Sequence, residues 1–179
     1  YPHPISPYAL TKLAGEYYCS FFSHHYGMPA IALRYFNVFG PRQALDDEYA
    51  VVIPKFINCI LQGKSFPVYG TGRQSRDFTF VSNVVDANIL AAKNKTIRYG
   101  VFNIASGKDY SVLELSRAIN LIAGKKVRPL FLKKRPGDVY RTLADLSLAN
   151  KVIKFRPRVT FLEGLRITVS YWRKICAEK

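Results

Sequence analysis

Acidic residues are scarce in this chain. Only 12 Asp and Glu stand against 27 Lys and Arg among 179 residues, which gives a net charge of +15 at pH 7. Most of the excess lies from Gly124 onward, where 15 basic residues face 4 acidic ones. Such an excess suits a nucleic-acid surface or a pocket for a doubly charged diphosphate. No zinc-finger, RNA-recognition or homeodomain-like pattern accompanies it, so nucleic-acid binding is not favoured.

Cysteines and long apolar runs are also in short supply. Cys19, Cys59 and Cys176 are far apart and lack metal-ligand spacing, and no histidine completes a zinc motif with them. We therefore expect reduced, buried thiols and no metal site. No stretch approaches the roughly 18 apolar residues that span a bilayer, and no basic-then-apolar signal pattern opens the chain. These absences argue against a membrane protein and predict a cytoplasmic one.

Helix-like and strand-like segments alternate along the chain, which predicts an α/β fold. Ser111 with Glu114 forms a capping box, and Thr160 with Glu163 opens the last helix. Ser82 or Asn83 is expected to cap the third helix. The expected helices are 7–26, 51–62, the capped segment to 94, 112–123, 146–151 and 161–176. The expected strands are 30–36, 66–69, 77–81, 100–104, 127–132 and 139–144, with a loop over 37–49.

Tyr8 and Lys12 lie on one face at the start of the first helix. Ser6 is a good N-cap and Pro7 suits the first helical position, so the pair falls in the first turns. A free tyrosine has a pKa of about 10 and acts as a base at neutral pH only where a neighbouring ammonium favours the phenolate. Taken alone, a helix-start aromatic beside a solvated lysine explains the pair better. The helix is expected to bury Leu10, Leu13, Ala14, Tyr17 and Phe21.

Four further motifs change that balance. They are Leu33–Arg42 (LRYFNVFGPR), Tyr69–Gly72 (YGTG), Arg76–Phe78 (RDF) and Arg135–Val139 (RPGDV). In this order and spacing the set resembles the extended short-chain dehydrogenase/reductases, specifically the nucleotide-sugar epimerases of the UDP-hexose 4-epimerase type. The resemblance covers essentially the whole chain and implies a Rossmann-like fold with a smaller substrate-binding domain.

By this resemblance Tyr8 and Lys12 are the catalytic pair, and NAD is the cofactor. Tyrosine takes the proton of the sugar 4-hydroxyl, while lysine tunes it and hydrogen-bonds the nicotinamide ribose. A hydride leaves C4, the 4-keto sugar turns over, and the hydride returns to the other face, so NAD is regenerated. Tyr35 lines the nicotinamide. The Gly70–Gly72 turn is not a cofactor loop, because it lacks a third glycine and a following helix.

The resemblance also implies a UDP-sugar site. Phe36 borders the sugar, and Asn37 donates to the diphosphate. Arg76 pairs with the diphosphate, and Arg135 and Asp138 hold phosphate and ribose, since a guanidinium fork suits phosphate and a carboxylate suits hydroxyls. The uracil side comprises Val51, Val52, Lys55 and Tyr69. The structural alternatives are core packing at positions 35 and 36, helix-face packing on the uracil side, and an exposed salt bridge at Asp138.

Thr142 bears on the choice of sugar. In this family the residue at its place borders the C2 substituent, and bulky side chains there exclude N-acetyl groups. Threonine is small, so UDP-N-acetylhexosamines or uronic sugars are expected to fit as well as UDP-hexoses. The resulting prediction is an NAD-dependent UDP-sugar 4-epimerase. The alternatives are a nucleotide-sugar dehydratase or decarboxylase with the same pair, and an inactive UDP-sugar-binding fragment.

Part of such an enzyme is not in this sequence. The family carries a glycine-rich NAD loop and a catalytic Ser or Thr well ahead of the tyrosine, whereas this chain starts shortly before Tyr8. We therefore expect the C-terminal portion of a longer protein, with the NAD-binding part missing. Residues 1–45 would end the Rossmann-like domain, and 46–179 would mainly form the nucleotide-sugar-binding domain, with segments returning to the Rossmann sheet. Alone, the chain is expected to be inactive and to expose an apolar face, whereas the full-length protein is expected to be a homodimer.

Overall fold

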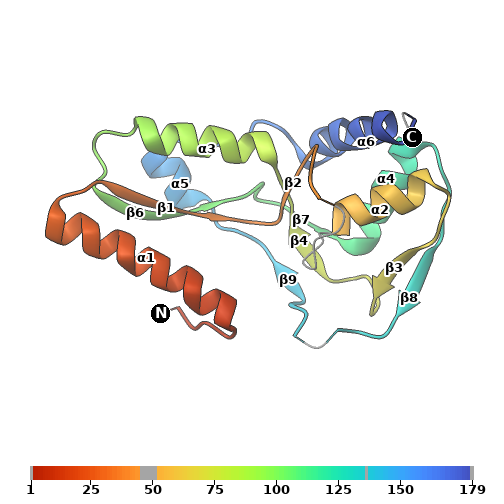
Figure 1. The fold of residues 1–179 in the computed structure, drawn as a ribbon, viewed down its shortest axis with the longest axis horizontal. Helices are drawn as coiled ribbons and strands as arrows, with labels where there is room; N and C mark the ends of the chain where they lie inside the picture. The colour runs from red at the N-terminus through yellow and green to blue at the C-terminus, as the bar shows by residue number, and fades with distance from the viewer. Residues whose placement is uncertain (1, 45–51, 136, 178–179) are drawn as a thin grey trace.

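The computed structural model describes residues 2–44, 52–135 and 137–177 and shows an α/β fold (Figure 1), as predicted. Its helices are α1 (Pro7–Tyr26), α2 (Val52–Leu61), α3 (Val81–Lys93), α4 (Val112–Ala123), α5 (Ser147–Ile153) and α6 (Phe161–Ala177). Its strands are β1 (Ala30–Tyr35), β2 (Val38–Phe39), β3 (Phe66–Tyr69), β4 (Ser75–Asp77), β5 (Thr79–Phe80), β6 (Tyr99–Ile104), β7 (Asp109–Ser111), β8 (Pro129–Leu132) and β9 (Arg141–Thr142).

Parallel pairing dominates the sheets of the described residues. β1 runs parallel to β6, β2 to β5, and β3 to β8. The three-stranded sheet has β4 at its centre, antiparallel to β7 and parallel to β9. Because parallel neighbours need long crossovers, each of these pairs joins segments that are far apart in the chain.

The β1–β6 pair lies between helices. α1 covers one side of it, while α3 and α5 cover the other (Figure 1). Two polar contacts fix α1 to the strand pair: Arg34 forms a bidentate ion pair with Glu16, and the Ser23 hydroxyl donates to the carbonyl of Arg98. The apolar cluster on the other side contains Val84, Ala87, Phe102, Ile104, Ala149, Ile153 and Phe155.

A second apolar cluster holds α2, α4 and α6 against β3 and β5. The Phe161 ring stacks on Phe78 and Tyr110, with ring centroids 5.7 and 4.1 Å apart. Ile57, Leu115 and similar side chains fill the space between the helices with no exposed surface. The predicted domain boundary at residue 45 falls in 45–51, outside the described residues, and it stays a prediction.

Most predicted helix ends agree with the structure. The Ala9 N–H donates to Ser6 Oγ at 3.1 Å, and Gly27 ends α1 with a φ of 65°. The capping box of Ser111 and Glu114 is present at α4. The expected cap of the third helix was wrong. α3 starts at Val81 without a side-chain cap, and the Asn83 side chain instead bonds the backbone of residues 158 and 159.

Other expectations need correction too. The predicted loop contains β2, and the predicted strand at 77–81 is divided between β4, β5 and the start of α3. Cys176 is exposed rather than buried. The expected buried face of α1 is largely open, since a two-stranded sheet is too narrow to cover a 20-residue helix. Its exposed large apolar and aromatic side chains are Tyr8, Leu10, Tyr17, Tyr18, Phe21, Phe22 and Tyr26.

Candidate functional site

A groove of about 730 Å³ lies between α1 and β1 and gathers the predicted catalytic residues. Helical spacing places Tyr8 and Lys12 on the same face of α1, with Lys12 Nζ 5.2 Å from the centroid of the Tyr8 ring. Tyr35, at the end of β1, lines the groove as well. The walls are mixed apolar and polar, with Ala9, Leu13, Cys19, Ala32 and Leu33 among the lining residues.

Two polar contacts order the walls of this groove. Glu16 accepts from Arg34 Nε and Nη2 at 2.5 and 2.6 Å, and this hydrogen bonding holds the pKa of Arg34 above its ordinary value. The Tyr35 hydroxyl donates to Asn88 Oδ1 on α3 at 3.0 Å. Tyr35 is therefore tied to the helix behind the sheet and is not a plain core aromatic, since it is 47% exposed.

These residues fit the nicotinamide riboside end of NAD. The groove offers apolar walls for a ring, an ammonium for ribose hydroxyls, and a phenol beside it. Within residues 2–44, 52–135 and 137–177, no glycine-rich turn leads into a helix, so this part of the chain offers no cradle of that kind for the cofactor's diphosphate. The described residues bring together no group of three or more His, Cys, Asp or Glu that could hold a metal ion.

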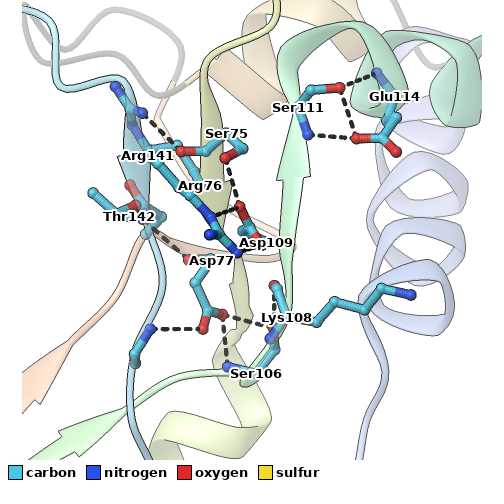
Figure 2. A network of polar contacts seen from close by, with 12 residues as sticks. Ser75, Arg76, Asp77, Ser106, Lys108, Asp109, Ser111, Glu114, Arg141 and Thr142 are labelled. Atoms are coloured by element: carbon cyan, nitrogen blue, oxygen red, sulfur yellow. Dashed lines mark hydrogen bonds and ion pairs between the residues drawn. The ribbon is translucent and has the colours of Figure 1, made fainter.

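A second set of predicted residues meets at the β4–β9 pair (Figure 2). Arg76 stands opposite Thr142 in the strand register, and its Nη2 donates to Asp138 Oδ1 at 2.5 Å. Both side chains of this ion pair are mostly shielded, with 17% and 26% exposed. The Asn37 amide donates to the carbonyl of Asp77 at 3.0 Å and to Thr142 Oγ1 at 3.4 Å. Asn37 thus braces this site in addition to its predicted diphosphate role.

The other predicted residues that the structure describes lie outside these two sets. The Arg135 guanidinium lies 3.8 Å from the centroid of the Tyr69 ring. This cation–π contact joins the residue predicted to bind phosphate to the residue predicted to border the base. On α2, Val52 packs against the second apolar cluster while Lys55 is exposed. Phe36, directly after β1, is half-buried. Val51 lies outside the described residues.

Two carboxylates at this site were not singled out from the sequence. Asp77 is fully buried and accepts hydrogen bonds from Ser106 and from the backbone N–H groups of Gly107 and Ala144. Asp109 accepts from Arg141 and from Ser75 Oγ, and these bonds hold its pKa well below the ordinary value. One pattern in the sequence indicated a special role for Asp77, because it is an acidic residue at the start of the mostly apolar stretch 77–81. No such pattern surrounds Asp109.

The parallel strand pairs, the Tyr-x-x-x-Lys groove and the arginine-rich second site define a Rossmann-like α/β protein of the dehydrogenase/reductase kind. The profile of the NAD-dependent epimerase/dehydratase family matches residues 1–105. The chain belongs to that family, whose cofactor is NAD.

Curated relatives resemble the chain over nearly its whole length. A putative UDP-glucose 4-epimerase of Methanocaldococcus jannaschii is 37% identical over 96% of this chain and 54% of its own length. A UDP-N-acetyl-alpha-D-glucosaminuronate decarboxylase of Bacillus cytotoxicus is 35% identical over 94% of this chain and 53% of its own. The chain therefore spans about half the length of the curated relatives it matches.

Solved structures give the same result. The UDP-N-acetylglucosamine 4-epimerase of Methanobrevibacter ruminantium, in complex with UDP-N-acetylmuramic acid, has a TM-score of 0.91 at 43% identity, covering 97% of this chain and 55% of that one. The UDP-glucose 4-epimerase of Thermotoga maritima with UDP-glucose reaches 0.92 at 38%, covering 98% and 56%. The UDP-glucuronic acid 4-epimerase of Bacillus cereus, with UDP-glucuronic acid and NAD, reaches 0.88 at 33%, covering 98% and 55%.

Proposed function

We propose that this chain is the substrate-binding portion of an NAD-dependent UDP-sugar 4-epimerase and carries its Tyr/Lys catalytic pair. The observation that carries the proposal is the placement of Tyr8 and Lys12 together in the α1–β1 groove, with a separate arginine-bearing site at β4–β9. The similarity to 4-epimerases solved with UDP-sugars supports it.

In this proposal the groove supplies acid/base chemistry. Tyr8 removes the proton of the sugar 4-hydroxyl and later returns it, and Lys12 stabilises the tyrosinate and holds ribose hydroxyls. NAD supplies the redox chemistry by accepting and returning a hydride at C4. Ala9, Leu13 and Leu33 supply the apolar part of the groove lining beside this pair.

The second site holds the nucleotide. Arg76 and Arg135 neutralise the diphosphate, and Asp138 accepts from ribose hydroxyls. Tyr69, stacked under Arg135, borders the base, as do Val52 and Lys55 on α2. Val51 is assigned to the base as well, from the sequence alone. Phe36 and Thr142 border the sugar, and the small Thr142 side chain leaves room for an N-acetyl group at C2. The proposed substrates are UDP-hexoses and UDP-N-acetylhexosamines.

Tyr8→Phe tests the chemistry in the protein as its gene encodes it, with NAD present. We expect UDP-sugar epimerisation to fall by about 10²- to 10⁴-fold, because a positioned general base contributes that much, while UDP-sugar affinity stays unchanged. Tyr171→Phe is the matched control and keeps full activity, because it removes a hydroxyl from α6, which lies at the opposite end of the molecule from α1 (Figure 1). Epimerisation that survives Tyr8→Phe would refute the proposed mechanism.

Decarboxylation of a UDP-uronic sugar is the second candidate. The 35% identity to a UDP-N-acetyl-alpha-D-glucosaminuronate decarboxylase favours it. Both reactions begin with oxidation at C4, so the same pair serves either one. Release of carbon dioxide from a UDP-uronic acid, without 4-epimer formation, would select this candidate over the epimerase.

A homodimer is also proposed for the intact protein. The support is the exposed aromatic face of α1, because contiguous apolar surface of this kind marks association sites. Sedimentation of the wild type beside Phe22→Asp tests the dimer, since a buried charge at the interface should yield monomers.

In the described residues, no helix is both long and apolar enough to cross a membrane.

A further inference from the structure

Strand β9 has little of its own to keep it in place. It consists of Arg141 and Thr142 only, and the neighbouring Tyr140 and Leu143 are 66% and 44% exposed. Backbone pairing joins it to β4, with Ser75 opposite Arg141 and Arg76 opposite Thr142. A slip by one residue would turn Thr142 to the other face of the sheet. The position of Thr142 therefore depends on contacts outside the strand.

One such contact comes from Asp109 on β7, on the far side of β4. Its carboxylate accepts from Arg141 Nε and Nη2 at 2.8 and 3.1 Å, and from Ser75 Oγ at 2.6 Å (Figure 2). The bond set spans all three strands of the sheet. Bidentate pairing fixes the angle as well as the distance of the guanidinium. Asp109 thus fixes β9 immediately before Thr142.

The other contact comes from Asp77 at the end of β4. Its Oδ1 accepts from the N–H and hydroxyl of Ser106 at 2.8 and 2.6 Å. Its Oδ2 accepts from the N–H of Gly107 at 3.0 Å and from the N–H of Ala144 at 3.4 Å. A fully buried carboxylate is costly unless such donors surround it. Asp77 thus holds the chain at Ala144, two residues beyond Thr142, where β9 ends.

Thr142 is held from both sides while it faces the proposed substrate ligands. Across the strand pair stands Arg76, which is bonded to Asp138. The hydroxyl oxygen of Thr142 accepts a hydrogen bond from the Asn37 amide. A shift of β9 would therefore move Thr142 relative to Arg76 and to the sugar of the proposed substrate, without removing any group that touches the ligand.

We propose that Asp77 and Asp109 are positioning residues of the sugar subsite, which set sugar preference by fixing Thr142 opposite Arg76. This inference rests on the proposed UDP-sugar site. Neither carboxylate touches the ligand. Both act through the backbone and side chains of residues 141–144.

The test compares Asp109→Asn and Arg141→Gln with the wild type in the intact protein, by calorimetric titration with UDP, UDP-glucose and UDP-N-acetylglucosamine. Arg141 is 59% exposed in its side chain, so both variants are expected to fold. We expect affinity for the two UDP-sugars to fall about fivefold, the weight of one partly exposed ion pair. Affinity for UDP itself should hardly change, and the preference between the two sugars should narrow, while circular dichroism should show both variants folded at the temperature of the titration.

The matched control is Asp86→Asn. It removes a carboxylate of α3 that lies 4.0 Å from Arg158, so it deletes a longer and more exposed Asp–Arg ion pair away from β9. The charge-reversed double variant Asp109→Arg with Arg141→Asp should recover sugar preference, because it rebuilds the contact. For Asp77→Asn, faster hydrogen exchange at Gly107 and Ala144 should accompany the loss of sugar affinity.

The outcomes separate the two proposals. A wild type that binds UDP-sugars, beside Asp109→Asn and Arg141→Gln variants of unchanged affinity and preference, would overturn the positioning role. A wild type that binds no UDP-sugar would overturn the proposed function first. Equal weakening of UDP and UDP-sugars would mean that the carboxylates support the whole site rather than the sugar subsite, which also contradicts the inference.

Discussion

Gly164 in α6 offers a sharp test of how the second apolar cluster is packed. A glycine inside a helix is less favourable than alanine by about 1 kcal/mol, so Gly164→Ala should stabilise the chain if only the helix mattered. A Cβ built at this position, however, would lie 2.5 Å from Phe80 Cδ2 and 2.6 Å from Phe80 Cγ. Carbon atoms normally approach to about 3.5–4.0 Å, so the Phe80 ring would have to move by roughly 1 Å.

The ring has little freedom to move. Phe80 is 6% exposed and packs edge-on against Phe39, with ring centroids 5.6 Å apart. Overpacking of such a core costs about 1–3 kcal/mol. Gly15 in α1 provides the comparison, because a Cβ there would meet nothing within 4 Å. The gain in helix propensity from glycine to alanine is the same at both positions and cancels in the comparison. We therefore expect the free energy of unfolding of Gly15→Ala to be higher than that of Gly164→Ala by about 1–3 kcal/mol.

Urea unfolding of the 179-residue chain measures this difference. Trp172, the single tryptophan, lies in α6 and reports on the cluster by fluorescence, while circular dichroism follows all the helices. In a Phe80→Leu background, adding Gly164→Ala should cost much less stability than it does in the wild type, since the smaller side chain at position 80 leaves room for the added methyl. Equal stabilisation by the two alanine substitutions would refute the packing described here.

Three further outcomes are expected. Asn83→Ala should lower the free energy of unfolding by about 1–3 kcal/mol, because the buried Asn83 side chain no longer pairs with the part-buried backbone groups of residues 158 and 159, and hydrogen exchange at those amides should accelerate. Ser111→Ala should cost about 1 kcal/mol in urea unfolding by deleting the α4 cap. The pKa of Asp109 is lowered by its bonds to Arg141 and Ser75, so the stability it contributes is complete above about pH 4 and is lost as the pH falls toward its folded-state pKa. The stability difference between the wild type and Asp109→Asn, measured by urea unfolding from pH 7 downward, should therefore shrink below about pH 4.

Local patterns predicted much of the fold. The cap at Ser6, the capping box at Ser111 and the apolar runs of β1, β3 and β6 agree with the structure, because each depends on residues within a few positions of one another. The pairing of Tyr8 with Lys12 belongs to the same class, since one helical turn is enough to bring them together.

Contacts between distant segments were not predictable in this way. The two-residue strands β2 and β5 are too short to show a period, and they exist because they pair with each other. Asparagine often caps helices, yet the Asn83 side chain forms hydrogen bonds with a segment 75 residues away in the chain. An exposed apolar face was expected for the chain taken alone, but which side chains of α1 lie open depends on the two strands beneath the helix and could not be read from its helical pattern.

The sequence by itself determined the helices, the longer strands β1, β3 and β6, and the identity of the groups that suit proton transfer and phosphate binding. Only the tertiary structure decided which of them meet. Asp109 and Arg141 are 32 residues apart, and Asp77 and Ala144 are 67 apart, so their hydrogen bonds form only when β7, β4 and β9 come together. The energy of such contacts depends on burial and distance, and both are properties of the folded sheet rather than of any stretch of chain.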